Sequence, residues 1–199
     1  MEPLWGTEIF PEYYSRFEKA ARETEGVTLT WEGHFIDPLF THTTTGFTRP
    51  GDEEHPYLAS VSCVHDPEEE GFVQEMIMQP EEAAKRVSAI PAGDGSFRTI
   101  PPEAFPEQVQ IISRDEAGYA LQLQIGGFPF NGEEVRLALG LPSACFELNR
   151  HGSDVRFTVR GRGHGWGLSQ TEAQALAEDG WSAEAILEYF YTGISFSSE

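Results

Sequence analysis

The chain has 199 residues, of which 39% are apolar and 12% aromatic, so it is long enough and apolar enough to bury a sizeable core. Its formal net charge of −20 repels polyanions, which argues against nucleic acid or acidic membrane as the main partner. No apolar run approaches the roughly 20 residues that span a bilayer, so we predict no transmembrane segment in this chain.

The first predicted elements are a helix and a β-hairpin. Apolar residues three or four positions apart predict an amphipathic helix over residues 11–25. Alternating residues over 27–31, followed after a short turn by the apolar segment 34–40, predict the hairpin. A polar loop over 41–56 and a strand over 57–64 are expected next.

The rest of the chain predicts further hairpins and short helices. Strands are expected over 72–78, 109–113, 119–125, 145–150 and 154–160, and helices over 80–87, 131–139, 169–178 and 182–191. Ser169 and Glu172 have the spacing of a capping box, and Ser182 is a suitable N-cap. We therefore predict an α+β fold of antiparallel hairpins with an N-terminal helix and two C-terminal helices.

Residues 160–170 are the most unusual segment of the sequence. They read Arg-Gly-Arg-Gly-His-Gly-Trp-Gly-Leu-Ser-Gln, in which glycine occupies every second position between a predicted strand and a predicted helix. Such glycines let the backbone approach a ligand closely, and the helix that follows offers free N–H donors. The segment has no P-loop or dinucleotide-binding spacing and no catalytic triad. Two interpretations stay open, a ligand-binding loop and a structural connector.

Basic residues gather just before and within this segment. Arg150, Arg156, Arg160 and Arg162 are four of only 13 basic residues in the chain. The predicted strand places Arg156 and Arg160 on one face, leading into the glycines. This pattern indicates a local anion-binding site, and the alternative is a surface strand with ordinary arginines.

Two further sets of residues are candidate ligand sites. Residues 41–48 read Thr-His-Thr-Thr-Thr-Gly-Phe-Thr, a hydroxyl-rich loop that can bind a polyol or satisfy its own turns. His55, Cys63 and His65 form an incomplete set of metal ligands, because no fourth ligand has a suitable spacing. We predict no metal and no cofactor.

Several segments together resemble one protein family. Residues 163–170 read Gly-His-Gly-Trp-Gly-Leu-Ser-Gln, and residues 180–193 read Gly-Trp-Ser-Ala-Glu-Ala-Ile-Leu-Glu-Tyr-Phe-Tyr-Thr-Gly. Both resemble the loop and the following helix of the stage II sporulation protein D (SpoIID/LytB) family. Weaker similarities at residues 24–33, 40–48 and 136–146 follow in the family's order, so the resemblance covers nearly the whole chain.

The resemblance implies a function in the bacterial cell wall. The family's sporulation member is a lytic transglycosylase that acts on peptidoglycan glycan strands whose stem peptides have been removed. This places the chain outside the cytoplasm or facing the cell wall, with glycan strands as ligand and a cell-wall amidase as a candidate partner. The alternatives are a non-catalytic peptidoglycan-binding or amidase-enhancer domain and a plain carbohydrate-binding module.

The sequence departs from the family at the expected catalytic acid. That acid is a Glu in an N-terminal Ser-Glu-Met-Pro segment followed by a helix, which residues 1–26 do not reproduce. We interpret Glu8 as a coincidental similarity, because too few residues separate it from Thr24. The catalytic residue is therefore unknown. We predict a single SpoIID-like domain over residues 1–199, either shortened at its N-terminus or belonging to a member without the usual acid.

We predict that the 160–170 loop faces the 41–48 loop and that the two bind the glycan. Removal of stem peptides frees the lactyl carboxylate of muramic acid, which arginine can pair. The residues expected to contact the glycan are Arg160, Arg162, His164, Gly165, Gly167, Ser169, Gln170, Thr43 and Thr44.

Overall fold

The structure is a computed structural model that describes residues 2–198 and the side chains of residues 10–197. The chain divides into two compact units, one formed by residues up to Ile36 together with those from Gly193 onwards, and one formed by Asp37–Thr192. Each unit is described by itself. The expectation of a single domain stays a prediction.

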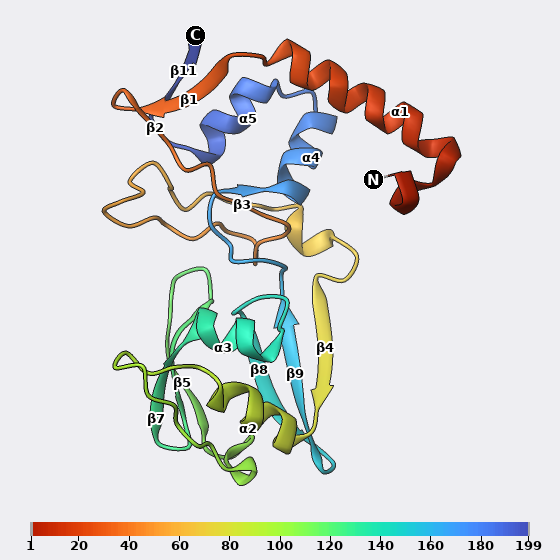
Figure 1. Ribbon diagram of the computed structural model, residues 1–199. Helices are drawn as coiled ribbons and strands as arrows, with labels where there is room; N and C mark the ends of the chain where they lie inside the picture. The colour runs from red at the N-terminus through yellow and green to blue at the C-terminus, as the bar shows by residue number, and fades with distance from the viewer. Residues whose placement is uncertain (1, 199) are drawn as a thin grey trace. The chain divides into compact units, whose positions relative to one another are not determined.

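The first unit combines one long helix with a small antiparallel sheet (Figure 1). Its elements are α1 (Glu2–Glu23), β1 (Val27–Trp31), β2 (His34–Phe35) and β11 (Ile194–Ser198). Strand β1 pairs with β2 as the sequence predicts, and on its other edge it pairs with β11, which was not predicted. The expected strand over 34–40 ends at Phe35, before Pro38, whose missing N–H cannot donate to a strand ladder.

The second unit contains two three-stranded antiparallel sheets and four α-helices (Figure 1). The first sheet has the order β4 (Val73–Met78), β9 (Asp154–Arg160), β8 (Phe146–His151), and the second has the order β5 (Val109–Arg114), β6 (Ala120–Ile125), β7 (Phe128–Asn131). The helices are α2 (Pro80–Ser88), α3 (Gly132–Leu139), α4 (Gln170–Glu178) and α5 (Ala183–Phe190). Two 3-10 turns, η1 (Asp66–Glu68) and η2 (Pro102–Ala104), lie in the loops.

One hydrophobic core joins both sheets to α2 and α3. Val155, Phe157 and Val159 of β9 are fully buried, while Arg156 and Arg160 on the alternate positions are not, as the period-two pattern predicts. The core also contains buried side chains of α2, α3, β6 and β8. The α+β class, the antiparallel hairpins, the N-terminal helix and the two C-terminal helices are confirmed.

The helix boundaries follow from capping residues. Asn131 accepts hydrogen bonds from the N–H groups of the first turn of α3, and Gly140 ends that helix with a φ of 71°. Ser169 and Ser182 cap α4 and α5 through their hydroxyls, as expected. These caps explain why the predicted bounds of α3, α4 and α5 are nearly correct, whereas the helix predicted over 11–25 begins at Glu2 and ends at Glu23.

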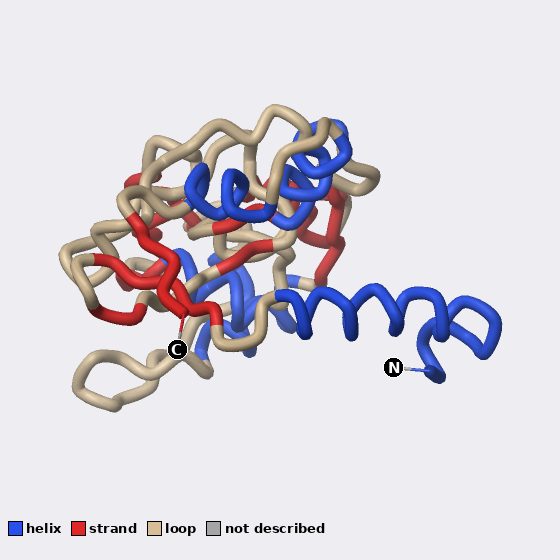
Figure 2. The backbone as a smooth tube through the Cα atoms, turned by 90° about the horizontal axis from the view of Figure 1, so that it is seen from above, coloured by secondary structure: helices blue, strands red, loops and turns tan. Residues whose placement is uncertain are grey.

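A large share of the chain lies outside helices and strands, as the tan segments of Figure 2 show. The prediction of a strand over residues 57–64 is wrong. Residues there form a loop in which the hydroxyl of Thr48 accepts from the N–H of Val61 and donates to the carbonyl of Ala59, and the backbone pairing beside it is an isolated bridge between Phe47 and Ser62. A two-residue parallel pair, β3 (Phe40–Thr41) with β10 (Leu168–Ser169), joins this region to the start of α4. Among the described residues, no helix is both long and apolar enough to cross a membrane.

Candidate functional site

The glycines of the 160–170 segment face the protein itself. Each of Gly161, Gly163, Gly165 and Gly167 has a positive φ, between 71° and 112°. A Cβ on Gly165 would lie 2.5 Å from the ring of Tyr119, and one on Gly163 or Gly167 would overlap atoms of the segment that contains β3. The alternation therefore lets the loop pack closely against its neighbours, and the intervening side chains are the more exposed ones.

Hydrogen bonds hold this loop beside the threonine-rich loop. Thr43 and Arg162 exchange two backbone bonds, of 3.0 and 2.8 Å, and the hydroxyl of Thr41 accepts from the N–H of Gly165. A hollow of about 190 Å³ adjoins this contact, and Thr43, Arg162 and Glu70 are among its lining residues. We call it the Arg162 hollow. The geometry thus brings the two predicted loops together.

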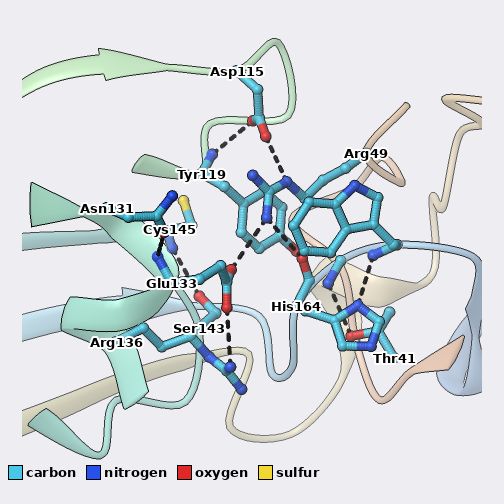
Figure 3. Close-up of polar contacts among 12 residues, drawn as sticks. Thr41, Arg49, Asp115, Tyr119, Asn131, Glu133, Arg136, Ser143, Cys145 and His164 are labelled. Atoms are coloured by element: carbon cyan, nitrogen blue, oxygen red, sulfur yellow. Dashed lines mark hydrogen bonds and ion pairs between the residues drawn. The ribbon is translucent and has the colours of Figure 1, made fainter. Parts of the chain in front are cut away.

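The buried side chain of Arg49 holds the loop in place, and this residue was not predicted from the sequence (Figure 3). Its side chain is only 4% exposed, its Nε donates to Asp115 at 2.6 Å and its Nη1 donates to Glu133 at 3.1 Å. Nη1 also donates to the carbonyl of His164, and the guanidinium lies 3.7 Å from the ring centroid of Trp166. No sequence signal separates this arginine from the exposed ones, because its burial depends on contacts distant in the chain.

A second buried anchor is Asp66. Its carboxylate accepts from the N–H and the hydroxyl of Thr44, both at 2.6 Å, and from the hydroxyl of Ser169 at 2.8 Å. Burial raises the pKa of Asp66, against the opposing effect of these hydrogen bonds. The side chains of Thr44 and Ser169 are fully buried and hydrogen-bonded to Asp66, so they hold the two loops together and present no surface to a ligand.

Of the four clustered arginines, Arg162 is the free one. The other three form ion pairs: Arg150 with Glu107, Arg156 with Glu75 and Arg160 with Glu147. Arg162 is exposed, and within the described part of the chain no carboxylate lies within ion-pair distance of it. The Arg162 hollow thus has an unpaired guanidinium at its edge.

The remaining predicted residues differ in exposure. His164 is half-buried, and its Nδ1 accepts from the N–H of Trp166 at 3.1 Å, while the two rings stack with centroids 5.6 Å apart. Burial, helped by the charges of Arg136 and Arg49, lowers the pKa of His164, so the ring is neutral at pH 7. Gln170 is exposed at the first turn of α4, whereas Thr43 is 2% exposed.

The acids of raised pKa or deep burial are not placed to protonate a ligand. Asp66 is enclosed, and Glu172, also buried, accepts from the backbone N–H of His65 at 2.8 Å and from its ring at 3.1 Å. Glycosidic cleavage needs a carboxylic acid within reach of the leaving oxygen. Glu8 belongs to α1, and its side chain lies outside the described residues. The catalytic acid therefore stays unassigned.

The residues weighed as metal ligands have other partners. Cys63 is fully buried, which raises the pKa of its thiol to about 12, and His65 bonds to Glu172. His55 pairs with Asp52. Among residues 10–197, whose side chains the structure describes, no group of three or more His, Cys, Asp or Glu side chains is arranged to hold a metal ion.

Comparison with known proteins finds relatives that share one name. No family model matches the chain. "Stage II sporulation protein D" of Bacillus amyloliquefaciens is 28% identical over 197 residues, which cover 97% of this chain and 54% of that protein. The protein of the same name from Bacillus subtilis (strain 168) is 28% identical over 204 residues, 99% of this chain and 55% of that protein.

This chain is related to the stage II sporulation protein D family. The similarity to these two proteins confirms the resemblance that the glycine loop and the following helices indicate. Their shared name makes this a sporulation-related family. The chain spans about half the length of the curated SpoIID relatives it matches.

Proposed function

We propose that this SpoIID relative binds peptide-free glycan strands of bacterial peptidoglycan, outside the cytoplasm, as part of a lytic transglycosylase. The observation that supports this most directly is the unpaired guanidinium of Arg162 beside Thr43 in a chain of net charge −20. A free arginine in so acidic a protein favours an anionic ligand, because charge-assisted pairing must offset the repulsion of the whole molecule.

The lactyl carboxylate of muramic acid fits this requirement. It is freed when the stem peptide is removed, so it distinguishes peptide-free strands from intact ones. A charge-assisted hydrogen bond in a partly desolvated site contributes about 1.5–3 kcal/mol. Hydroxyl and acetamide groups along the strand would then contact the exposed side chains of the glycine loop and Gln170.

The test is a titration with peptide-free glycan fragments. We expect Arg162→Gln to weaken binding at least about tenfold, which corresponds to the loss of about 1.4 kcal/mol. Arg150→Gln removes the same charge from an exposed ion pair and should bind normally. Fragments whose carboxylate has been reduced to the alcohol should bind the wild type and Arg162→Gln alike. Equal binding of the carboxylated glycan by both proteins would refute the proposal.

A second candidate is a non-catalytic peptidoglycan-binding or amidase-enhancer domain. It is favoured because the two buried acids, Asp66 and Glu172, are engaged by other residues. Incubation with peptide-free strands separates the two functions, because a lytic transglycosylase produces anhydromuramic ends. Binding without such ends would support the second function, in which a cell-wall amidase is the partner.

A further inference from the structure

A second hollow, of about 280 Å³, borders the same glycine loop at Trp166. Its walls are largely apolar and include Leu39, Pro50 and Leu58. We call it the Trp166 hollow. The indole that lines it is held in place, since its Nε1 donates to the carbonyl of Pro50 at 3.2 Å and the Arg49 guanidinium covers its ring. A preformed apolar hollow with fixed walls is a typical small-ligand site.

One polar pair lies among these apolar walls. The ring Nδ1 of His55 lies 2.8 Å from Oδ1 of Asp52, which also accepts from two backbone N–H groups. Because Nδ1 donates to a carboxylate, the Nε2 atom of the neutral ring is left as an acceptor. The hollow therefore combines an apolar wall with a hydrogen-bond acceptor on the side chain of His55.

We infer that the Trp166 hollow is a subsite for the acetamido group of a glycan sugar, adjacent along the strand to the sugar whose carboxylate Arg162 binds. An acetamido group has a methyl group for the apolar wall and an N–H that can donate to Nε2 of His55. This inference rests on the proposed function, because it takes the occupant to be the same glycan.

The shared loop supports one continuous ligand for both hollows. Arg162 and Trp166 are four residues apart, so at most about 14 Å of chain separates them. Both occupy the alternate positions of the loop that are not glycine, and these are the positions with exposed surface. We take the two hollows to be occupied by sugars of one extended strand.

The experiment uses neutral oligosaccharides, so that the carboxylate has no part in it. A tetramer of β-1,4-linked N-acetylglucosamine carries acetamido groups, and the matching tetramer of glucose does not. We expect the full chain to bind the first and not the second. His55→Leu, which keeps the apolar bulk and removes the acceptor, should weaken binding of the N-acetylglucosamine tetramer about five- to tenfold. His151→Leu, at the exposed end of β8 and outside both hollows, is the matched control.

Further variants distinguish the Trp166 hollow from the Arg162 hollow. Arg162→Gln should leave binding of the N-acetylglucosamine tetramer unchanged, so loss of carboxylate recognition and loss of acetamido recognition are separable. Trp166→Phe keeps an aromatic ring over Arg49 and provides a second variant, with an expected loss of similar size. Thermal melts check that each variant is folded. The inference would be overturned by equal binding of the two tetramers or by unchanged binding of the N-acetylglucosamine tetramer in both variants. It would also be overturned if an apolar peptide, and not the sugar, occupied the hollow in a competition experiment.

Discussion

Arg49 is the residue on which the contacts of the glycine loop converge. It joins the loop to Asp115 and Glu133, which lie far from it in the sequence, and it supports both His164 and Trp166. Removing one partner of a buried ion pair leaves the other charge uncompensated, which is strongly destabilising. The position of Trp166, and with it one wall of the Trp166 hollow, therefore depends on a residue that does not line that hollow.

Replacement of this arginine tests that dependence. Arg49→Met leaves Asp115 without its cation, and we expect the free energy of unfolding to fall by about 3 kcal/mol or more. Urea denaturation measures the change. Arg150→Met breaks an exposed pair of similar geometry and should cost no more than about 1 kcal/mol. A loss of the same small size in both variants would show that the buried pairs contribute little.

His65 gives the stability a defined pH dependence. Its hydrogen bond to Glu172 raises the pKa of the ring above its ordinary value of 6.5. A group whose pKa is raised by folding stabilises the protein fully below its unfolded pKa, and the contribution is lost as the pH rises through the folded pKa. The difference in unfolding free energy between wild type and His65→Gln should therefore be constant in acid and decrease above about pH 6.5.

Urea titrations between pH 5 and pH 9 measure this difference. His151→Gln serves as the reference, because His151 is exposed at the end of β8. A difference that increases with pH would contradict the role assigned to the His65–Glu172 bond.

At the scale of elements, the close packing of the 160–170 loop depends on glycines, because a Cβ at these positions would overlap neighbouring atoms. Gly165 and Gly127 have nearly equal φ values, +84° and +87°, but a Cβ on Gly165 meets the Tyr119 ring, whereas nothing lies within 4 Å of one on Gly127. Gly127→Ala thus reports backbone strain alone, and Gly165→Ala adds overpacking. Each effect costs about 1–3 kcal/mol, so Gly165→Ala should be destabilised by at least about 1 kcal/mol more.

Chemical denaturation of the two alanine variants tests this difference. Adding Tyr119→Leu to Gly165→Ala should recover part of the loss by making room for the new methyl group. Equal stability of the two single variants would mean that the loop moves away from Tyr119 without cost.

Elements with local signals were predictable from the sequence, and elements held by distant contacts were not. The helices α3, α4 and α5 carry their own caps, and β9 carries a clear period of two. The strand expected over 57–64 failed because a threonine hydroxyl competes with the ladder. The glycine loop was identified as unusual, but the contact of Gly165 with Tyr119 depends on the fold and has no local signal.

At the scale of the whole molecule, the net charge of −20 opposes the binding that Arg162 favours. The repulsion acts at long range and is screened by salt, since the Debye length shortens from about 30 Å at 0.01 M to about 8 Å at 0.15 M. We therefore expect the association rate with a carboxylated glycan to rise with salt, in the wild type and in Arg162→Gln alike.

The dissociation rate should respond differently. Salt weakens the short-range ion pair as well, so dissociation should accelerate with salt in the wild type and much less in Arg162→Gln. Stopped-flow measurements over this salt range separate the two rates. An association rate that falls as salt is added would show that the local charge of Arg162 outweighs the charge of the molecule.

The side-chain bonding of the loops has a consequence for backbone hydrogen exchange. The N–H groups of Thr44, Val61, Gly165 and Trp166 each donate to a side-chain atom instead of a strand partner. Their protection from deuterium thus reports on single side chains: the amide of Val61 on Thr48, and that of Thr44 on Asp66. In this part of the molecule, slow exchange is a property of individual hydroxyls, carboxylates and imidazoles, so deuterium uptake can locate a perturbed side chain residue by residue.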